Sequence, residues 1–301
     1  MVRELSPYVK LHVAVLLFGL TAIFGRLISL PELYLVWYRM GLTTLSFLFI
    51  PVVRREVLRW KISQIVRFMG IGCIVASHWV AFFGSVKYAN VSVTLTCMAT
   101  ASFFTSLVEP LVVGSRYKWR DGLFGLLVVP GVYLMFRFTQ GEAYTTGIFL
   151  GLGAALLASL FGSLNKRYIQ NHHATAVSFV ELGAGWLFLS VLVPFYGLNS
   201  EASFLPTGLD WLWLVILALL CTTLAYVYTM QALRKLTAFV VSLTINLEPV
   251  YGIALAFFLF QENEELPEGF FLGTLVILLS VFLYPISEIL FQKRGKKMTA
   301  Q

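Results

Sequence analysis

The chain has 301 residues, of which 58% are hydrophobic and only 12% are charged. A soluble domain of this size could not cover so much apolar surface with polar groups, whereas lipid can, so the composition predicts an integral membrane protein. The formal net charge of +7 would also suit nucleic acid. No aromatic stacking platform accompanies the basic residues, however, so no nucleic-acid partner is expected.

Ten apolar stretches follow one another along the chain, and each is about long enough to cross a membrane. A hydrocarbon core of roughly 30 Å needs about 20 apolar residues of helix. Because little sequence remains between the stretches, we expect an all-α membrane protein with ten transmembrane helices and no soluble domain. The expected spans are residues 8–28, 31–53, 64–86, 91–113, 120–138, 145–165, 174–197, 209–232, 237–260 and 266–288.

The basic residues are distributed unevenly between the two sides of the membrane. When the loops are assigned alternately, 18 of the 22 Lys and Arg residues fall on one side. Cytoplasmic loops accumulate Lys and Arg, so both termini are expected in the cytoplasm, and a bacterial plasma membrane is the expected location. The basic tail at 292–301 would then lie against anionic membrane lipids.

The second half of the chain repeats the pattern of the first. Val36-Trp-Tyr-Arg-Met-Gly41 in the second stretch matches Ser178-Phe-Val-Glu-Leu-Gly183 in the seventh, and a proline follows each. The repeat unit has an odd number of spans, so the second copy must enter the membrane from the opposite face. Such inverted repeats, here 1–140 and 141–291, are common in secondary transporters. A duplicated scaffold or receptor that transports nothing is the alternative.

Motifs in the second half resemble a known family. They are Ala225-Tyr-Val-Tyr-Thr-Met-Gln-Ala-Leu233, Leu243-Thr-Ile-Asn-Leu-Glu-Pro-Val250 and the closing Gln261-Glu262. They look like the second half of an EamA-type member of the drug/metabolite transporter superfamily, and the likeness covers nearly the whole chain. It implies an exporter or exchanger of small metabolites, often amino acids or related compounds, that works by alternating access around a cavity between the repeats.

The first half departs from this pattern at two places. Ser102-Phe103 stands where the second half has Glu248-Pro249, and Arg116 stands where it has Glu262. The positive-inside rule accounts for the second exchange, since an inverted repeat needs opposite charges at the two ends.

Four ionisable residues lie deep within the expected spans: Arg39, His78, Glu181 and Glu248. A charged side chain at the bilayer centre costs at least about 2.5–3.5 kcal/mol, so such residues normally face the bundle interior or a wet cavity. Arg39 and Glu181 occupy matching positions in the two repeats. We expect them to pair in one state and to yield to substrate in another, with Arg39 recognising a carboxylate; snorkelling or structural packing is the alternative.

Glu248 stands one residue before Pro249, which weakens the helix locally. The sequence predicts that Glu248 binds a substrate ammonium or a coupling proton and that Pro249 acts in gating; a structural glutamate is the alternative. His78 is a candidate proton relay or a hydrogen-bonded packing residue. The other residues expected to bind substrate are Trp79, Ser102, Asn165, Trp186, Tyr226, Tyr228 and Asn246.

Other functional classes fit the sequence less well. The spans contain neither a nucleophile–base pair nor a metal-ligand pattern, so an enzyme is not expected, and neither is a cofactor or a metal. There is no ATPase motif, which excludes a primary pump. Within transporters, the alternative is a nucleotide-sugar or phosphate-ester carrier, but that substrate needs several cations and only Arg39 lies deep in a span. The expected partners are a small-molecule substrate and membrane lipids, with protons as a candidate coupling ion.

Overall fold

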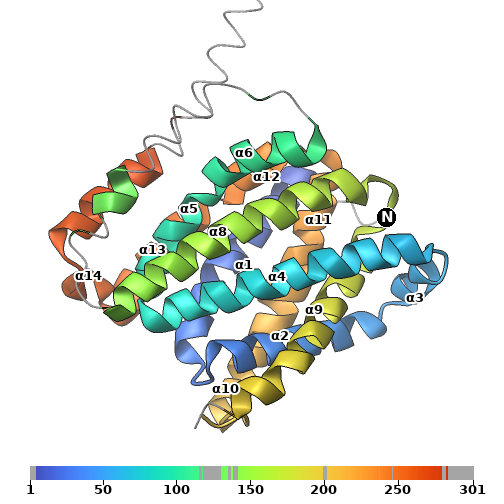
Figure 1. Cartoon of the computed structure of the whole chain (residues 1–301), viewed down its shortest axis with the longest axis horizontal. Coiled ribbons are helices and arrows are strands. Elements are labelled where there is room, and N and C mark those ends of the chain that lie inside the picture. The colour runs from blue at the N-terminus through green and yellow to red at the C-terminus, as the bar shows by residue number, and fades with distance from the viewer. Residues whose placement is uncertain are drawn as a thin grey trace, which may run out of the picture.

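The computed structural model describes residues 5–114, 142–198, 202–236, 238–245 and 247–279, together with 117, 130–134, 137 and 283. Every regular element among these residues is helical (Figure 1). The α-helices are α1 (Pro7–Leu27), α2 (Glu32–Leu48), α3 (Pro51–Val57), α4 (Ile62–Tyr88), α5 (Val91–Ala99), α6 (Ala101–Val113), α8 (Glu142–Tyr168), α9 (Ala174–Gly197), α10 (Gly208–Ala218), α11 (Ala225–Lys235), α12 (Ala238–Ile245), α13 (Leu247–Phe260) and α14 (Glu262–Glu265).

Within this part of the chain, six helical stretches are long and apolar enough to cross a bilayer, and α2 with α3 would make a seventh, bent by 90°. The chain is therefore an integral multi-pass membrane protein. Shorter apolar helices cover Leu247–Phe260 and Glu268–Leu279. The fifth expected span, 120–138, falls almost entirely outside the described residues, as does the end of the tenth. The total of ten spans therefore stays a prediction.

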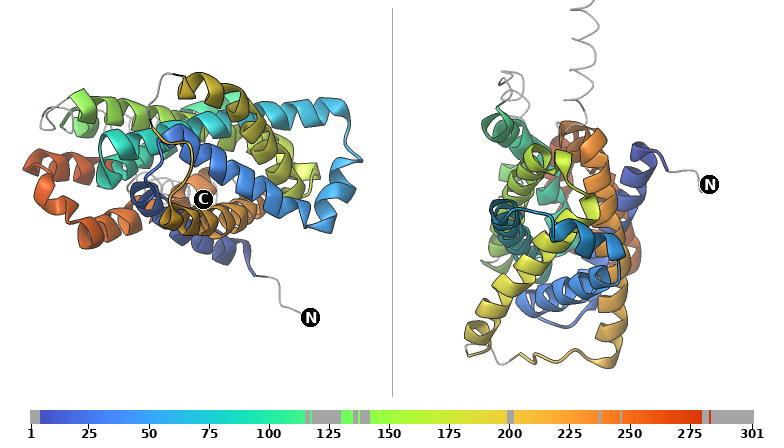
Figure 2. Two further views of the ribbon diagram at one scale, coloured as in Figure 1. Left: turned by 90° about the horizontal axis from the view of Figure 1, so that it is seen from below. Right: turned by 90° about the vertical axis from the view of Figure 1, so that its right-hand side faces the viewer.

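The helices of the two halves pack across one another in matched pairs. Helix α4 lies along α8 and α9, while α11 lies along α1, and α10 packs against α2 (Figures 1 and 2). In the internal repeat, α1 corresponds to α8, α2 to α9, and α4 to α10–α11. The contacts of α4 with α8 and α9 therefore correspond to those of α10–α11 with α1 and α2, as an internal repeat predicts. Small residues allow the close approach: Gly72 of α4 lies directly against the backbone of Glu181 in α9, where a Cβ would collide.

The fourth expected span of the first half is interrupted near its middle. In the first half α5 ends before Thr100, whose hydroxyl donates a hydrogen bond to the Cys97 carbonyl at 2.7 Å. In the second half, Pro249 has no N–H to donate to the carbonyl of Ile245, four residues earlier. Discontinuous helices of this kind commonly form the substrate sites of transporters.

A π-helical segment, η2 (Leu219–Leu224), joins α10 to α11. The hydroxyls of Thr222 and Thr223 donate to carbonyls five residues earlier, those of Leu217 at 2.7 Å and Ala218 at 2.9 Å. Such segments are uncommon and are often found at functional sites. No motif in the sequence predicts this one.

Candidate functional site

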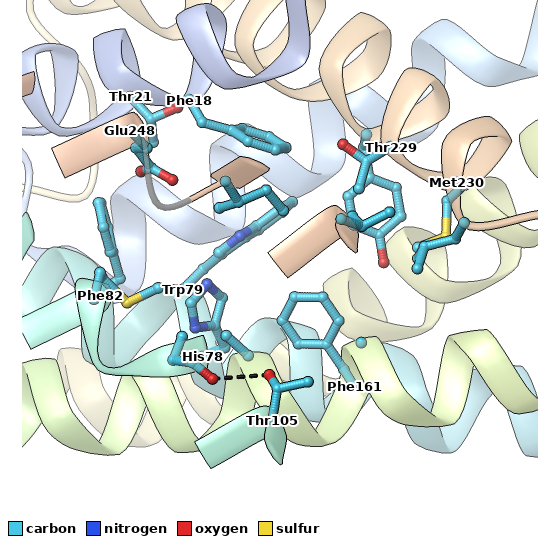
Figure 3. A pocket seen from close by; sticks show the side chains of 18 of the residues that line it. Phe18, Thr21, His78, Trp79, Phe82, Thr105, Phe161, Thr229, Met230 and Glu248 are labelled. Carbon is cyan, nitrogen blue, oxygen red and sulfur yellow. Dashed lines mark hydrogen bonds between the residues drawn. The ribbon is translucent and has the colours of Figure 1, made fainter. Parts of the chain in front are cut away.

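A cavity lies between the two halves, with about 1080 Å³ of empty space including its opening (Figure 3). The first half contributes residues of α1, α2, α4, α5 and α6, and the second contributes residues of α8, α11, α12 and α13. The lining is mostly apolar and aromatic. Its polar side chains are Thr21, Arg39, His78, Thr105, Tyr226, Thr229 and Glu248. An apolar pocket with a few convergent polar groups is typical of a small-molecule site.

Arg39 supplies the cation of this cavity. Its side chain comes from the middle of α2 and is only 1% exposed. The guanidinium carbon lies 3.9 Å from the centre of the Trp79 ring, and Nε donates to Thr222 Oγ1 at 2.6 Å. The Nη1 group is also buried but has no hydrogen-bond partner among the residues that the structure describes. Arg39 is therefore held in place by protein contacts while one of its donors stays available.

Glu248 supplies the carboxylate. It lies in the first turn of α13, is 7% exposed, and lines the cavity together with its neighbour Pro249. Among the described residues it forms no ion pair with Arg39, although both border the same space. One cavity thus contains a buried cation and a buried carboxylate that do not neutralise each other by direct contact.

Glu181 lies outside the lining, behind Tyr226, and is fully buried. Its Oε2 atom accepts hydrogen bonds from the Tyr226 hydroxyl at 2.5 Å and from Asn165 Nδ2 at 3.2 Å. The expected ion pair between Arg39 and Glu181 is absent from this state, because each residue binds other partners. Arg39 bonds to Thr222, and Glu181 bonds to the ends of α8 and α11.

The structure brings together six of the residues singled out in the sequence: Arg39, His78, Trp79, Tyr226, Glu248 and Pro249 all line the cavity. His78 Nδ1 lies 2.8 Å from the Ala154 carbonyl, which ties α4 to α8. Ser102, Asn165, Trp186 and Tyr228 lie outside the lining, and Asn246 is outside the described residues.

Several lining residues carry no signal in the sequence. Phe18, Thr21, Met98, Thr105, Thr229 and Met230 are such residues, and Figure 3 shows Thr21 and Thr229 around the same space as His78 and Glu248. Apolar residues and threonines are common in every span of this chain. Only the packing of the helices distinguishes those that face the cavity.

A second polar cluster joins the two halves at one end of the bundle. Glu262 of α14 is fully buried and accepts hydrogen bonds from Arg26 Nη1 at 2.8 Å and Ser92 Oγ at 2.6 Å. The backbone N–H groups of Val91 and Ser92 also donate to it, at 3.2 and 2.9 Å. Glu262 therefore sits at the N-terminus of α5, where the helix dipole favours a negative charge. Nothing in the sequence pattern predicts this contact.

Known proteins are similar to this chain over most of its length. An uncharacterized transporter of Bacillus subtilis, YxxF, is 24% identical over 268 residues, which cover 84% of this chain and 81% of that protein. An uncharacterized transporter of Haemophilus influenzae is 25% identical over 227 residues, covering 73% and 72%. A solved crystal structure at 15% identity shares the fold, with a TM-score of 0.65 over 94% of this chain and 98% of its own.

The EamA-like transporter family matches the chain twice, once in each half. The matched residues are 6–137 and 145–284, and they include nearly all of the helices that surround the cavity. The chain therefore belongs to the EamA-like transporter family.

Proposed function

We propose that this transporter is an exporter or exchanger of small metabolites, namely amino acids or related compounds, in a bacterial plasma membrane with both termini in the cytoplasm. The observation that carries the proposal is the cavity shared by the two halves, in which Arg39 and Glu248 are buried without being paired. Exchanging the conformations of two related halves around such a site gives alternating access.

The polar groups of the cavity suit a zwitterionic substrate. The free Nη1 of Arg39 can donate to a carboxylate, and the carboxylate of Glu248 can accept from an ammonium group. Trp79, Phe82 and Phe161 offer aromatic walls to an apolar side chain. Arg39 is the one Lys or Arg in the described lining, which favours this substrate over a nucleotide sugar or phosphate ester that carries two negative charges.

A ligand screen tests this assignment. The purified protein is heated with single L-amino acids, organic acids or sugar phosphates, and each hit is then followed as counterflow in proteoliposomes. A ligand at 100 times its Kd stabilises the native state by about 2.7 kcal/mol, which raises the unfolding temperature measurably. We expect amino acids to stabilise and to exchange. Stabilisation and exchange by sugar phosphates alone would establish the alternative carrier instead.

Thr222→Val should weaken substrate binding by about fivefold, because it removes the acceptor of Arg39 Nε but keeps the shape of the side chain. A hydrogen bond of this kind contributes about 1 kcal/mol net. The measurement is the concentration dependence of counterflow for the hit from the screen. Thr222→Ser keeps the hydroxyl and should bind as the wild type does.

Thr223→Val is the matched control for this prediction. Thr223 lies in the same π-helical segment and makes the same backward hydrogen bond, to Ala218, but its side-chain partner is Ser46 in place of Arg39. It should leave substrate affinity close to the wild-type value. Equal losses in Thr222→Val and Thr223→Val would show that the segment matters only for packing.

A further inference from the structure

Three residues form a buried polar cluster behind the cavity. Glu181 comes from α9, Asn165 from the end of α8 and Tyr226 from the start of α11. Glu181 and Asn165 are fully buried, and Tyr226 is 4% exposed. Tyr226 and Asn165 both donate to the same carboxyl oxygen, Oε2 of Glu181.

The second carboxyl oxygen of Glu181 and the amide oxygen of Asn165 are buried acceptors that receive no hydrogen bond from the described residues. These atoms are Oε1 of Glu181 and Oδ1 of Asn165. A buried acceptor left without a donor is costly. A single proton on Oε1 would supply the missing donor: the carboxyl O–H could donate to Asn165 Oδ1, while the Asn165 amide already donates to Oε2. The carboxyl and amide groups would then be joined by two hydrogen bonds.

No cation of the described residues forms an ion pair with Glu181 in this state. The cationic side chain from α2, Arg39, bonds to Thr222, and His78 of α4 lies against the Ala154 carbonyl. Lys166, next to Asn165 on α8, donates to the carbonyls of Leu233 and Leu236. The helices around Glu181 carry further ionisable side chains, and none of these bonds to Glu181. They are Glu32, Tyr34 and Tyr38 on α2, Arg54, Arg55 and Glu56 on α3, Arg67, Cys73, Lys87 and Tyr88 on α4, Glu142, Tyr144, Arg167 and Tyr168 on α8, and Tyr228, Arg234 and Lys235 on α11.

An ionised carboxylate without a cation is unfavourable inside a membrane protein, whereas the neutral acid is tolerated. We propose that Glu181, Asn165 and Tyr226 form a proton-binding site and that the proton bound at Glu181 is coupled to substrate movement. This inference rests on the transport function proposed above. On binding, the carboxylate takes a proton from water and becomes a carboxylic acid. On release, the proton returns to water on the other side, and the two donors to Oε2 remain on the carboxylate.

Tyr226 connects this site to the substrate cavity. Its ring lines the cavity and lies 6.3 Å, centre to centre, from the ring of Trp79, which in turn packs under Arg39. Its hydroxyl reaches back to Glu181. A substrate that moves the Tyr226 ring therefore changes the hydrogen bonding of the proton site. Substrate and proton need not touch for one to influence the other.

Infrared spectroscopy tests the site without knowledge of the substrate. The full-length protein in lipid is titrated with acid and base while the carboxylic acid C=O band is recorded. We expect a protonated carboxyl band at neutral pH with a component that is missing in Glu181→Gln and shifted in Tyr226→Phe, because the Tyr226 hydroxyl bonds to the same group. Glu264→Gln, which alters an exposed carboxylate, should leave the band unchanged. An identical band in the wild type and in Glu181→Gln would overturn the proton site.

Proteoliposomes test the coupling. Vesicles are loaded with a mixture of the twenty common L-amino acids, and a pH-sensitive dye reports proton movement as labelled amino acids exchange. The wild type and Glu264→Gln should move protons with the amino acids, whereas Glu181→Gln should not, and its exchange should no longer vary with pH. Proton movement in Glu181→Gln, or accumulation driven by sodium in place of a pH gradient, would refute the coupling. Absence of amino-acid exchange in the wild type would instead refute the proposed function, and the infrared result would still decide the proton site.

Discussion

Arg39→Ala is expected to reduce substrate affinity by about 10- to 100-fold, because a hydrogen bond to a charged group contributes about 1.5–3 kcal/mol. Arg39 is the one Lys or Arg side chain in the described lining, so no neighbour can take its place. The measurement is counterflow in proteoliposomes over a range of substrate concentrations. Membrane insertion should be retained, since the side chain contributes one hydrogen bond and a stack on Trp79 to the fold.

Arg39→Lys separates charge from geometry. Lysine keeps the positive charge but lacks the planar guanidinium that binds a carboxylate through two parallel hydrogen bonds. Its affinity should fall between those of the wild type and Arg39→Ala. Near-normal exchange in Arg39→Ala would show that this residue does not bind substrate. The negatively charged group of a zwitterion or phosphate ester would then have to bind to another cation.

Glu262→Ala should destabilise the protein by about 3–5 kcal/mol, since each buried donor left without its acceptor costs about 1–3 kcal/mol. The substitution removes four hydrogen bonds and leaves Arg26 and the first N–H groups of α5 without their acceptor. Thermal unfolding of the purified protein measures the loss. Glu262→Gln should lose less, because its amide oxygen can still accept from the helix N-terminus.

Glu264→Ala serves as the control for this prediction. Glu264 lies two residues further along α14 and is exposed, so its removal should change the unfolding temperature little. If the two alanine variants unfolded at the same temperature, the buried cluster at Glu262 would not be what holds the halves together at this end.

Much of the architecture could be predicted from the sequence because lipid imposes simple rules on it. Long apolar stretches have to be helices, and charges inside them have to face protein or water. Arg39 and Glu248, singled out on that ground, both line the cavity. The pairing of Arg39 with Glu181, expected for one state of the transport cycle, is not seen in this one. Matching positions in a repeat establish equivalence by symmetry, but they do not establish contact.

The partners that the structure gives to buried polar groups were also beyond sequence reasoning. Arg39 bonds to Thr222 only because η2 brings that hydroxyl to α2, and Glu262 caps α5 across 170 residues of chain. Both contacts join elements that are distant in the sequence. Residue type and spacing constrain only local structure, so the sequence could not show either of these contacts.

The π-helical segment also sets the rotational register of everything that follows it. A π turn accommodates one residue more than an α-helical turn, and each residue of an α-helix advances by about 100°. Deleting one residue between Leu219 and Leu224 would therefore leave an ordinary helix but rotate Tyr226, Thr229 and Leu233 away from the cavity. The segment thus determines which residues of α11 face the cavity. A helical wheel drawn from Trp211 with a constant 100° step would therefore assign the wrong face of α11 to the cavity.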